Sequence, residues 1–224
     1  KRGLRRGDRR VTRGEMADSA APPLSEAELA ELNRRFETAT PEQILTWAVE
    51  TFPTDLVMTS SFQHEGVALA HMLRPIRADV PVIFINTRFH FRETLEYRDA
   101  IVKLLGLNLR VVESVISFED FKARYTDHLY NRDPDLCCHI NKVEPLQLAL
   151  KGARAWINAR RRDQTADRST MGVVELNGAI VKIKIGDSPI LARPFCQVAS
   201  RPVRNTSELR APLARQVTPD VQMA

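Results

Sequence analysis

The sequence predicts an α/β fold in which a mostly parallel sheet carries helices on both faces. Short apolar runs of strand length alternate with segments of helical periodicity, as in consecutive βα units. A hydrophobic content of 43% over 224 residues suffices for one well-packed domain. Polar stretches follow three predicted strands, at 60–66, 86–91 and 158–168. Ligands of open α/β sheets bind beyond the carboxyl ends of the strands, so these stretches predict a binding site there.

The predicted domain opens with two helices. Ser25 and Glu28 form a capping box, and apolar residues at helical spacing follow it. Thr40-Pro-Glu-Gln43 is a second helix start, because proline is favoured at the first helical position.

From residue 55 onward, strands and helices alternate. A hairpin over 173–183 closes the series, with Asn177-Gly178 as its turn. The elements before it are strands at 55–59, 80–85, 109–113 and 153–157 and helices at 67–73, 92–105, 118–129 and 138–150.

The formal net charge of +5 resides in the N-terminal segment. Residues 1–15 hold seven basic and two acidic side chains, which accounts for the whole excess. Such a run can bind phosphate backbones non-specifically, but a solvated tail is its commoner state. We therefore expect residues 1–24 to form a basic, disordered arm and do not expect nucleic acid as a partner.

The composition predicts a cytoplasmic protein with no membrane association. No apolar run approaches the roughly 20 residues of a membrane span, and no secretory signal follows the basic segment. Three cysteines do not make a disulfide framework and fit a reducing compartment.

The turn at 60–66 joins a strand to a helix and carries two serine hydroxyls. Its backbone N–H groups can cradle an anion at the helix N-terminus, although it lacks the glycine and lysine pattern of a Walker loop. A simple helix cap is the alternative interpretation, and both stay open on these residues alone.

Two further stretches carry groups suited to a charged nucleotide. The stretch 86–91 mixes a cation, aromatic rings and small polar groups, which suits a nucleotide and also occurs in ordinary loops. The run 160–164 and Arg168 offer guanidinium forks that match phosphate or sulfate. A solvated basic face is the alternative for the arginines, and their place at a strand end favours anion binding.

Cys137 and Cys138 stand side by side. Neighbouring helical residues point about 100° apart, so both thiols cannot pack into one core face. The pair can ligate an iron–sulfur cluster, or the residues can be small apolar groups at a helix start. A zinc site with His139 fits poorly, because three consecutive residues do not converge on one tetrahedron.

Over about residues 25–185 the chain resembles the assimilatory adenylyl-sulfate and phosphoadenylyl-sulfate reductases. Four phrases in the right order carry this resemblance. They are Thr59-Ser-Ser-Phe-Gln-His-Glu65, Ile85-Asn-Thr-Arg-Phe-His-Phe91, Leu136-Cys-Cys-His-Ile-Asn-Lys-Val-Glu-Pro-Leu146 and Trp156-Ile-Asn-Ala-Arg-Arg-Arg-Asp-Gln-Thr-Ala-Asp-Arg168.

The resemblance implies an adenine-nucleotide hydrolase-like fold over 25–186 and a nucleotide and phosphosulfate site within it. The tandem cysteines look like those of the branch that carries a [4Fe–4S] cluster and prefers adenylyl sulfate, with Cys137 and Cys138 as metal ligands. The substrate-binding residues it implies are Ser60, Ser61, Phe62, Gln63, Glu65, Thr87, Arg88, Phe91, Arg161, Arg162, Gln164 and Arg168.

The implied reaction belongs to sulfate assimilation and cysteine biosynthesis. A cysteine thiolate attacks the sulfur of adenylyl sulfate, and thioredoxin or glutaredoxin then releases sulfite, leaving AMP as the other product. A homo-oligomer is compatible with the family. Whether the 3′-phosphate is accepted stays open.

The chain also departs from the family pattern. Ala159 stands where the family usually has glycine, and the later Cys-x-x-Cys pair and the terminal Glu-Cys-Gly-Leu/Ile-His segment are missing. Cys196 matches neither motif, so no catalytic residue is assigned and Cys196 is only a candidate. The proline-rich stretch 187–224 is expected to be irregular or disordered, as from a truncated or frame-shifted end. We therefore expect weak binding of adenylyl sulfate or AMP and little turnover.

Two other functions compete with this hypothesis. An ATP pyrophosphatase that adenylates its substrate would share the fold, but its Ser-Gly-Gly-x-Asp-Ser loop has no counterpart near Ser60. A non-catalytic module that binds nucleotides or nucleic acid is the other, with residues 1–15 as its arm.

Overall fold

The computed structural model describes residues 24–125, 128–160 and 171–185. The predictions for the basic arm, for Arg161, Arg162, Gln164 and Arg168, and for the 187–224 tail with Cys196 therefore lie outside the described residues.

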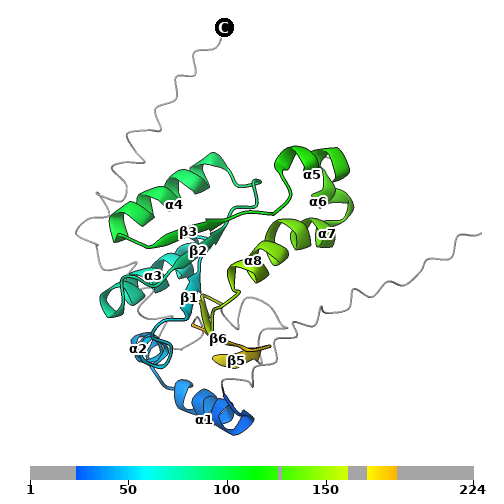
Figure 1. Cartoon of the computed structure of the whole chain (residues 1–224). Coiled ribbons are helices and arrows are strands. Elements are labelled where there is room, and N and C mark those ends of the chain that lie inside the picture. The colour runs from blue at the N-terminus through cyan, green and yellow to red at the C-terminus, as the bar shows by residue number, and fades with distance from the viewer. Residues whose placement is uncertain (1–23, 126–127, 161–170, 186–224) are drawn as a thin grey trace, which may run out of the picture.

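The described elements alternate between helices and strands (Figure 1). In chain order they are α1 (Glu26–Phe36), α2 (Pro41–Thr51), β1 (Leu56–Thr59), α3 (His64–Ile76), β2 (Val82–Ile85), α4 (Arg92–Leu105), β3 (Leu109–Val112), α5 (Phe118–Tyr125), α6 (Leu129–Arg132), α7 (Pro134–Cys138), the π-helical turn η1 (His139–Val143), α8 (Glu144–Ala149), β4 (Ala155–Asn158), β5 (Val174–Asn177) and β6 (Ile180–Lys184).

The six described strands form one sheet in the order β3-β2-β1-β4-β6-β5. All neighbouring strands pair in parallel except β5, which runs antiparallel to β6 at one edge. The chain builds outward from β1 to β3 and then returns to place β4 on the other side of β1. This reversal makes the carboxyl ends of β1 and β4 a topological switch point, where such folds bind ligands.

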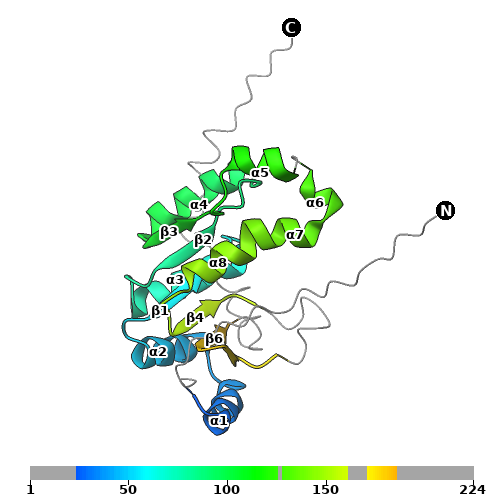
Figure 2. The same ribbon diagram turned by 45° about the vertical axis from the view of Figure 1, so that its right-hand side comes forward.

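Different helices cover the two faces of the sheet, as the sequence predicted. Met58, Phe84 and Ile157 pack with apolar side chains of α2, α3 and α4 in the main core. The alternate residues of the same strands, Val57 and Ile83 among them, pack against Leu146 and Ala149 of α8. Figure 2 shows α8 in front of the sheet. The period-two alternation of strand side chains thus assigns each residue to one helical layer.

A satellite cluster lies beyond the sheet, where α5, α6 and α7 gather (Figures 1 and 2). Its buried members are Phe121, Leu129, Cys137 and Ile140. Within the predicted helix 118–129, the described part of α5 reaches Tyr125, and α6 begins at Leu129. Among the described residues, this cluster surrounds Cys137, the first of the two adjacent cysteines.

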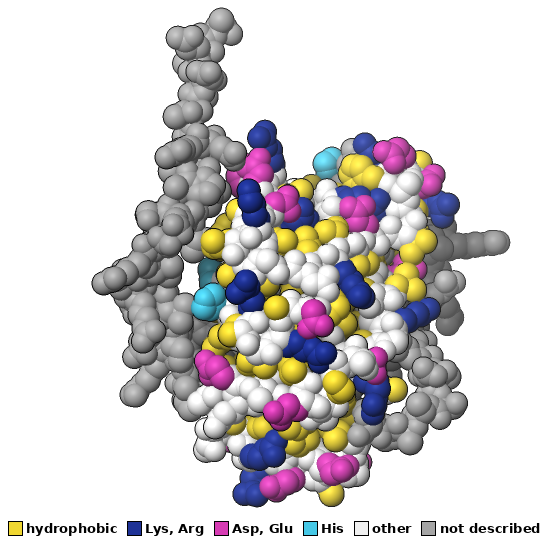
Figure 3. All heavy atoms as spheres, turned by 60° about the vertical axis from the view of Figure 1, so that its left-hand side comes forward, with side chains coloured by type: hydrophobic (Ala, Val, Ile, Leu, Met, Phe, Trp, Pro, Cys, Tyr) yellow, Lys and Arg dark blue, Asp and Glu magenta, His cyan; other side chains and the backbone are white. Residues whose placement is uncertain are grey.

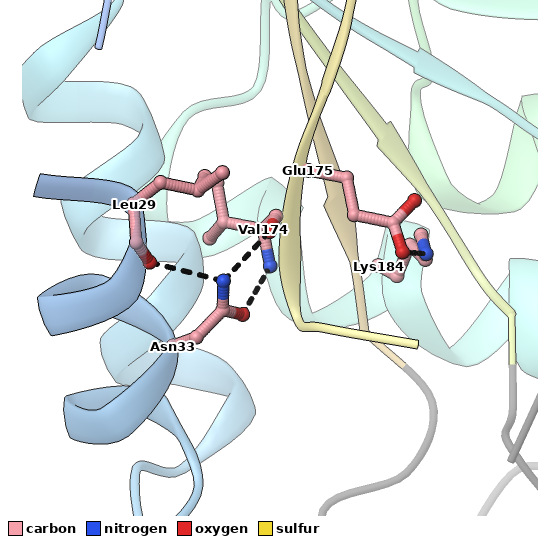
Figure 4. A network of polar contacts seen from close by, with 5 residues as sticks. All are labelled: Leu29, Asn33, Val174, Glu175 and Lys184. Atoms are coloured by element: carbon pink, nitrogen blue, oxygen red, sulfur yellow. Dashed lines mark hydrogen bonds and ion pairs between the residues drawn. The ribbon is translucent and has the colours of Figure 1, made fainter. Parts of the chain in front are cut away.

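The opening helices begin where the sequence predicted. Ser25 accepts a hydrogen bond from the Glu28 N–H while the Glu28 carboxylate binds the Ser25 N–H, and Pro41 opens α2. Asn33 on α1 then ties the first helix to the edge strand. Its Nδ2 donates to the Val174 carbonyl at 2.8 Å and its Oδ1 accepts from the Val174 N–H at 2.9 Å (Figure 4).

Two helix starts differ from the prediction in a way that matters for the site. Helix α3 begins at His64 instead of Val67, which shortens the serine turn. The predicted helix 138–150 starts four residues earlier, because Asp133 caps the Leu136 N–H at 2.9 Å and Pro134 occupies the first helical position. A π-helical turn follows the cysteines, and such turns frequently mark functional sites.

Candidate functional site

A cleft of about 340 Å³ opens at the switch point, on the face of the sheet that α8 covers. The carboxyl ends of β1, β2 and β4 form its floor, and Lys142 and Leu146 approach from η1 and α8. Its lining residues are Thr59, Ser60, Ser61, Gln63, Glu65, Gly66, Ile83, Ile85, Thr87, His90, Lys142, Leu146, Trp156, Asn158, Ala159 and Arg160.

The serine turn holds its conformation through its own side chains. The Ser60 hydroxyl is buried and accepts the Phe62 N–H at 3.0 Å, while Phe62 takes a left-handed φ of 58° and packs its ring against Phe84. The Gly66 backbone lies so close to the Ser60 side chain that a Cβ at position 66 would be 2.5 Å from the Ser60 Oγ. The turn therefore depends on glycine at the point where α3 crosses over Ser60.

The first turn of α3 has no side-chain cap. Gln63 occupies the N-cap position without a side-chain hydrogen bond to the helix. The first N–H groups of an α-helix have no intrahelical partner, so this end favours an anion in the cleft. Four residues of the predicted set line that part of the cleft: Ser60, Ser61, Gln63 and Glu65. Phe62, also in the predicted set, packs in the core instead.

The predicted stretch 86–91 divides between the cleft and the satellite cluster. Thr87 lines the cleft, together with His90. Arg88 and Phe91 are not among the lining residues: the Arg88 Nη2 donates to the Ile116 carbonyl at 2.8 Å, and Phe91 is 79% exposed at the N-cap of α4. The sequence pattern could not separate these residues, because the left-handed φ of 65° at Arg88 redirects the chain there.

Several lining residues are absent from the predicted substrate-binding residues, among them Thr59, Lys142, Trp156 and Asn158, although Asn158 opens the polar stretch 158–168. Strand alternation could have identified Trp156 and Asn158 as members of one face. Trp156 Nε1 donates to Thr59 Oγ1 at 2.8 Å, which joins β4 to β1 beneath the cleft. Lys142 could not be found this way, because the π-helical turn sets its direction.

The tandem cysteines point to different surroundings, as their adjacency predicted. Cys137 is buried in the satellite cluster and Cys138 is exposed. Burial raises the pKa of the Cys137 thiol, which also accepts a hydrogen bond from the Asn141 amide at 3.8 Å. Burial is the largest cause of the raised pKa, the Asn141 hydrogen bond opposes it, and the neighbouring Cys138 adds a smaller increase.

This arrangement does not fit a four-thiolate cluster. Such a cluster needs converging thiolates, whereas the apolar surroundings of Cys137 favour its protonated thiol, and Cys138 faces elsewhere. Among the described residues, no group of three or more His, Cys, Asp or Glu side chains could hold a metal ion.

The surface outside the cleft mixes charges of both signs. On the face in Figure 3, Lys and Arg side chains alternate with Asp and Glu, without an uninterrupted basic patch. None of the described helices combines the length and the apolar character that a membrane span requires.

Comparison with known proteins gives consistent matches. The model of the phosphoadenosine phosphosulfate reductase domain family matches residues 55–208. The chain is 34% identical over 169 residues to the adenosine 5'-phosphosulfate reductase of Salinibacter ruber, covering 75% of this chain and 67% of the relative. It is 38% identical over 161 residues to the phosphoadenosine 5'-phosphosulfate reductase of Gloeobacter violaceus, covering 71% and 67%.

A solved structure shares the fold. The phosphoadenylyl-sulfate reductase from Candida auris, in a phosphate complex, superposes with a TM-score of 0.67 at 26% identity, covering 79% of this chain and 88% of that one. The chain spans less of some other relatives, for example 65% of the adenosine 5'-phosphosulfate reductase of Streptomyces coelicolor. The family resemblance predicted from the four phrases is confirmed: this chain belongs to the phosphoadenosine phosphosulfate reductase domain family.

Proposed function

We propose that the cleft binds adenylyl sulfate and that the protein reduces it to sulfite and AMP with electrons from thioredoxin or glutaredoxin. One observation carries this proposal. In a chain of this family, the uncapped N-terminus of α3 and the cations Lys142 and Arg160 meet at the switch point of the sheet.

The charge of the cleft supports an anionic ligand. Adenylyl sulfate carries negative charge on both its phosphate and its sulfate, and hydroxyls and N–H groups can bind both. Ser60, Ser61 and Thr87 offer hydroxyls, and Lys142 and Arg160 offer positive charge. The apolar walls Ile83 and Ile85 suit a base or ribose better than a second charged group.

The proposed reaction is a thiol-dependent two-electron reduction. A cysteine thiolate attacks the sulfur, the S–O bond to the phosphate breaks, and AMP leaves with the electron pair of that bond. A thiol of thioredoxin then attacks the modified cysteine and releases sulfite as a mixed disulfide forms. A second thiol resolves the disulfide, so one dithiol is oxidised for each sulfate group reduced. No described residue is assigned as the attacking thiol.

The test is anaerobic incubation with radiolabelled adenylyl sulfate and reduced thioredoxin. We expect labelled sulfite and AMP to appear slowly and in equal amounts. A Cys196→Ser variant locates the thiol, because sulfite formation disappears if Cys196 attacks and persists if another cysteine does. Pyrophosphate release from ATP without any sulfite would contradict the proposal and indicate an adenylating enzyme instead.

A further inference from the structure

Asn158 is a buried polar residue without a hydrogen-bond partner for its side chain. It is 6% exposed, and both its Nδ2 and its Oδ1 lack a partner among the residues that the structure describes. It ends β4 and lines the cleft. Leaving both atoms of a buried amide unpaired is costly, so the arrangement indicates that something outside the protein satisfies them.

The register of the sheet places Asn158 beside the proposed phosphosulfate subsite. Asn158 pairs with Thr59 across β4 and β1, and Ser60 follows Thr59 directly. Adjacent strands lie about 4.8 Å apart. Asn158 therefore lies one strand away from the segment that leads into the serine turn, and both line the same cleft.

The chemistry of an amide narrows the possible ligand groups. The Oδ1 of Asn158 needs a hydrogen-bond donor, and the phosphate and sulfate of adenylyl sulfate offer only acceptors at neutral pH. The donors of this ligand are the two ribose hydroxyls and the exocyclic amine of adenine. The ribose is bonded directly to the phosphate, whereas the amine lies at the far end of the base.

We propose that Asn158 is a specificity-determining residue whose amide hydrogen-bonds the 2′- and 3′-hydroxyls of the ribose. This inference rests on the proposed function, because it takes the anion subsite at Ser60 as its reference point. A hydroxyl both donates and accepts, so two hydroxyls satisfy Oδ1 and Nδ2 together. The amide thereby selects a ribonucleotide with free hydroxyls over one that lacks them.

The experiment measures binding of AMP, 2′-deoxy-AMP and 3′-deoxy-AMP by isothermal titration calorimetry. The proteins are the wild type, Asn158→Leu and the control Asn131→Leu, whose asparagine is exposed on α6. Leucine fills a similar volume and removes the unpaired amide. We expect Asn158→Leu to melt at the same or a higher temperature than wild type, yet to bind AMP about tenfold or more weakly.

The analogues show what the amide contacts. Wild type should bind at least one deoxy analogue several-fold more weakly than AMP, and Asn158→Leu should bind AMP and the analogues almost equally. Non-additivity of this kind reports a direct contact. A purely structural role would instead lower the melting temperature together with the affinity.

Three other results would also overturn the inference, and they separate it from the proposed function. Unchanged AMP affinity in Asn158→Leu, or an equal penalty for the deoxy analogues in both proteins, refutes the ribose contact and leaves the proposed function standing. Absence of AMP and adenylyl-sulfate binding in the wild type refutes both.

Discussion

Gly66 lies close against the Ser60 side chain at the proposed anion subsite. A Cβ at position 66 would lie 2.5 Å from the Ser60 Oγ but 3.4 Å from the Ser60 Cβ, so only the hydroxyl obstructs it. Gly66→Ala should therefore destabilise the wild type by about 1–3 kcal/mol through overpacking. In a Ser60→Ala background the same change should be neutral, or stabilising by up to about 1 kcal/mol, because alanine favours the helix.

The measurement is urea denaturation of wild type, both single variants and the double variant. The difference between the two effects of Gly66→Ala gives the coupling between the residues. Equal effects of Gly66→Ala in both backgrounds would show that the contact with the hydroxyl does not hold the turn.

The two adjacent thiols should differ in reactivity. Burial raises the pKa of Cys137, so at pH 8 this thiol holds less of the reactive thiolate than an ordinary cysteine, and it is also inaccessible. Iodoacetamide should alkylate Cys138 well before Cys137, as followed by peptide mass spectrometry. Raising the pH should speed labelling of Cys137, and urea should abolish the difference. Equal rates in the native protein would contradict the buried position of Cys137.

At the scale of elements, Asn33 closes the exposed edge of the sheet. Its side chain binds both the N–H and the C=O of Val174, much as another strand would. Asn33→Ala leaves these buried backbone groups unpaired, so unfolding free energy should fall by about 2 kcal/mol. Asn131→Ala, at an exposed site on α6, should change it by less than about 0.5 kcal/mol. The two variants are compared by urea denaturation, and equal stability would show that α1 does not anchor β5.

Sequence patterns located most elements because local rules decide them. The capping box at Ser25 and the proline at position 41 lie at helix starts. The predicted hairpin forms, but its turn lies one residue later than Asn177-Gly178, because Asn177 ends β5 and pairs with Ile180. The patterns missed the start of α7, although Asp133 carries a capping signal. They also could not foresee the π-helical turn, because its backbone arrangement has no distinct residue pattern.

At the scale of the whole molecule, topology unites residues that the sequence keeps apart. Ser60, Thr87 and Asn158 lie in separate βα units, and only the reversal of strand order at β1 gathers them in one cleft. Strand-end positions predicted part of this cleft. They could not predict that Arg88 faces away from the cleft, because its side chain packs against Ile116 and Phe118. They also could not predict that Phe91 is exposed at the N-cap of α4.

Titration of adenylyl sulfate into the protein tests the central claim most directly. Calorimetry of the wild type, Lys142→Gln and the control Lys103→Gln compares a cleft lysine with an exposed lysine on α4. We predict saturable binding to the wild type and the control, and affinity about tenfold or more weaker in Lys142→Gln, because a charge-assisted contact is lost. Absence of binding in the wild type, or equal affinity in all three proteins, would contradict a phosphosulfate site in this cleft.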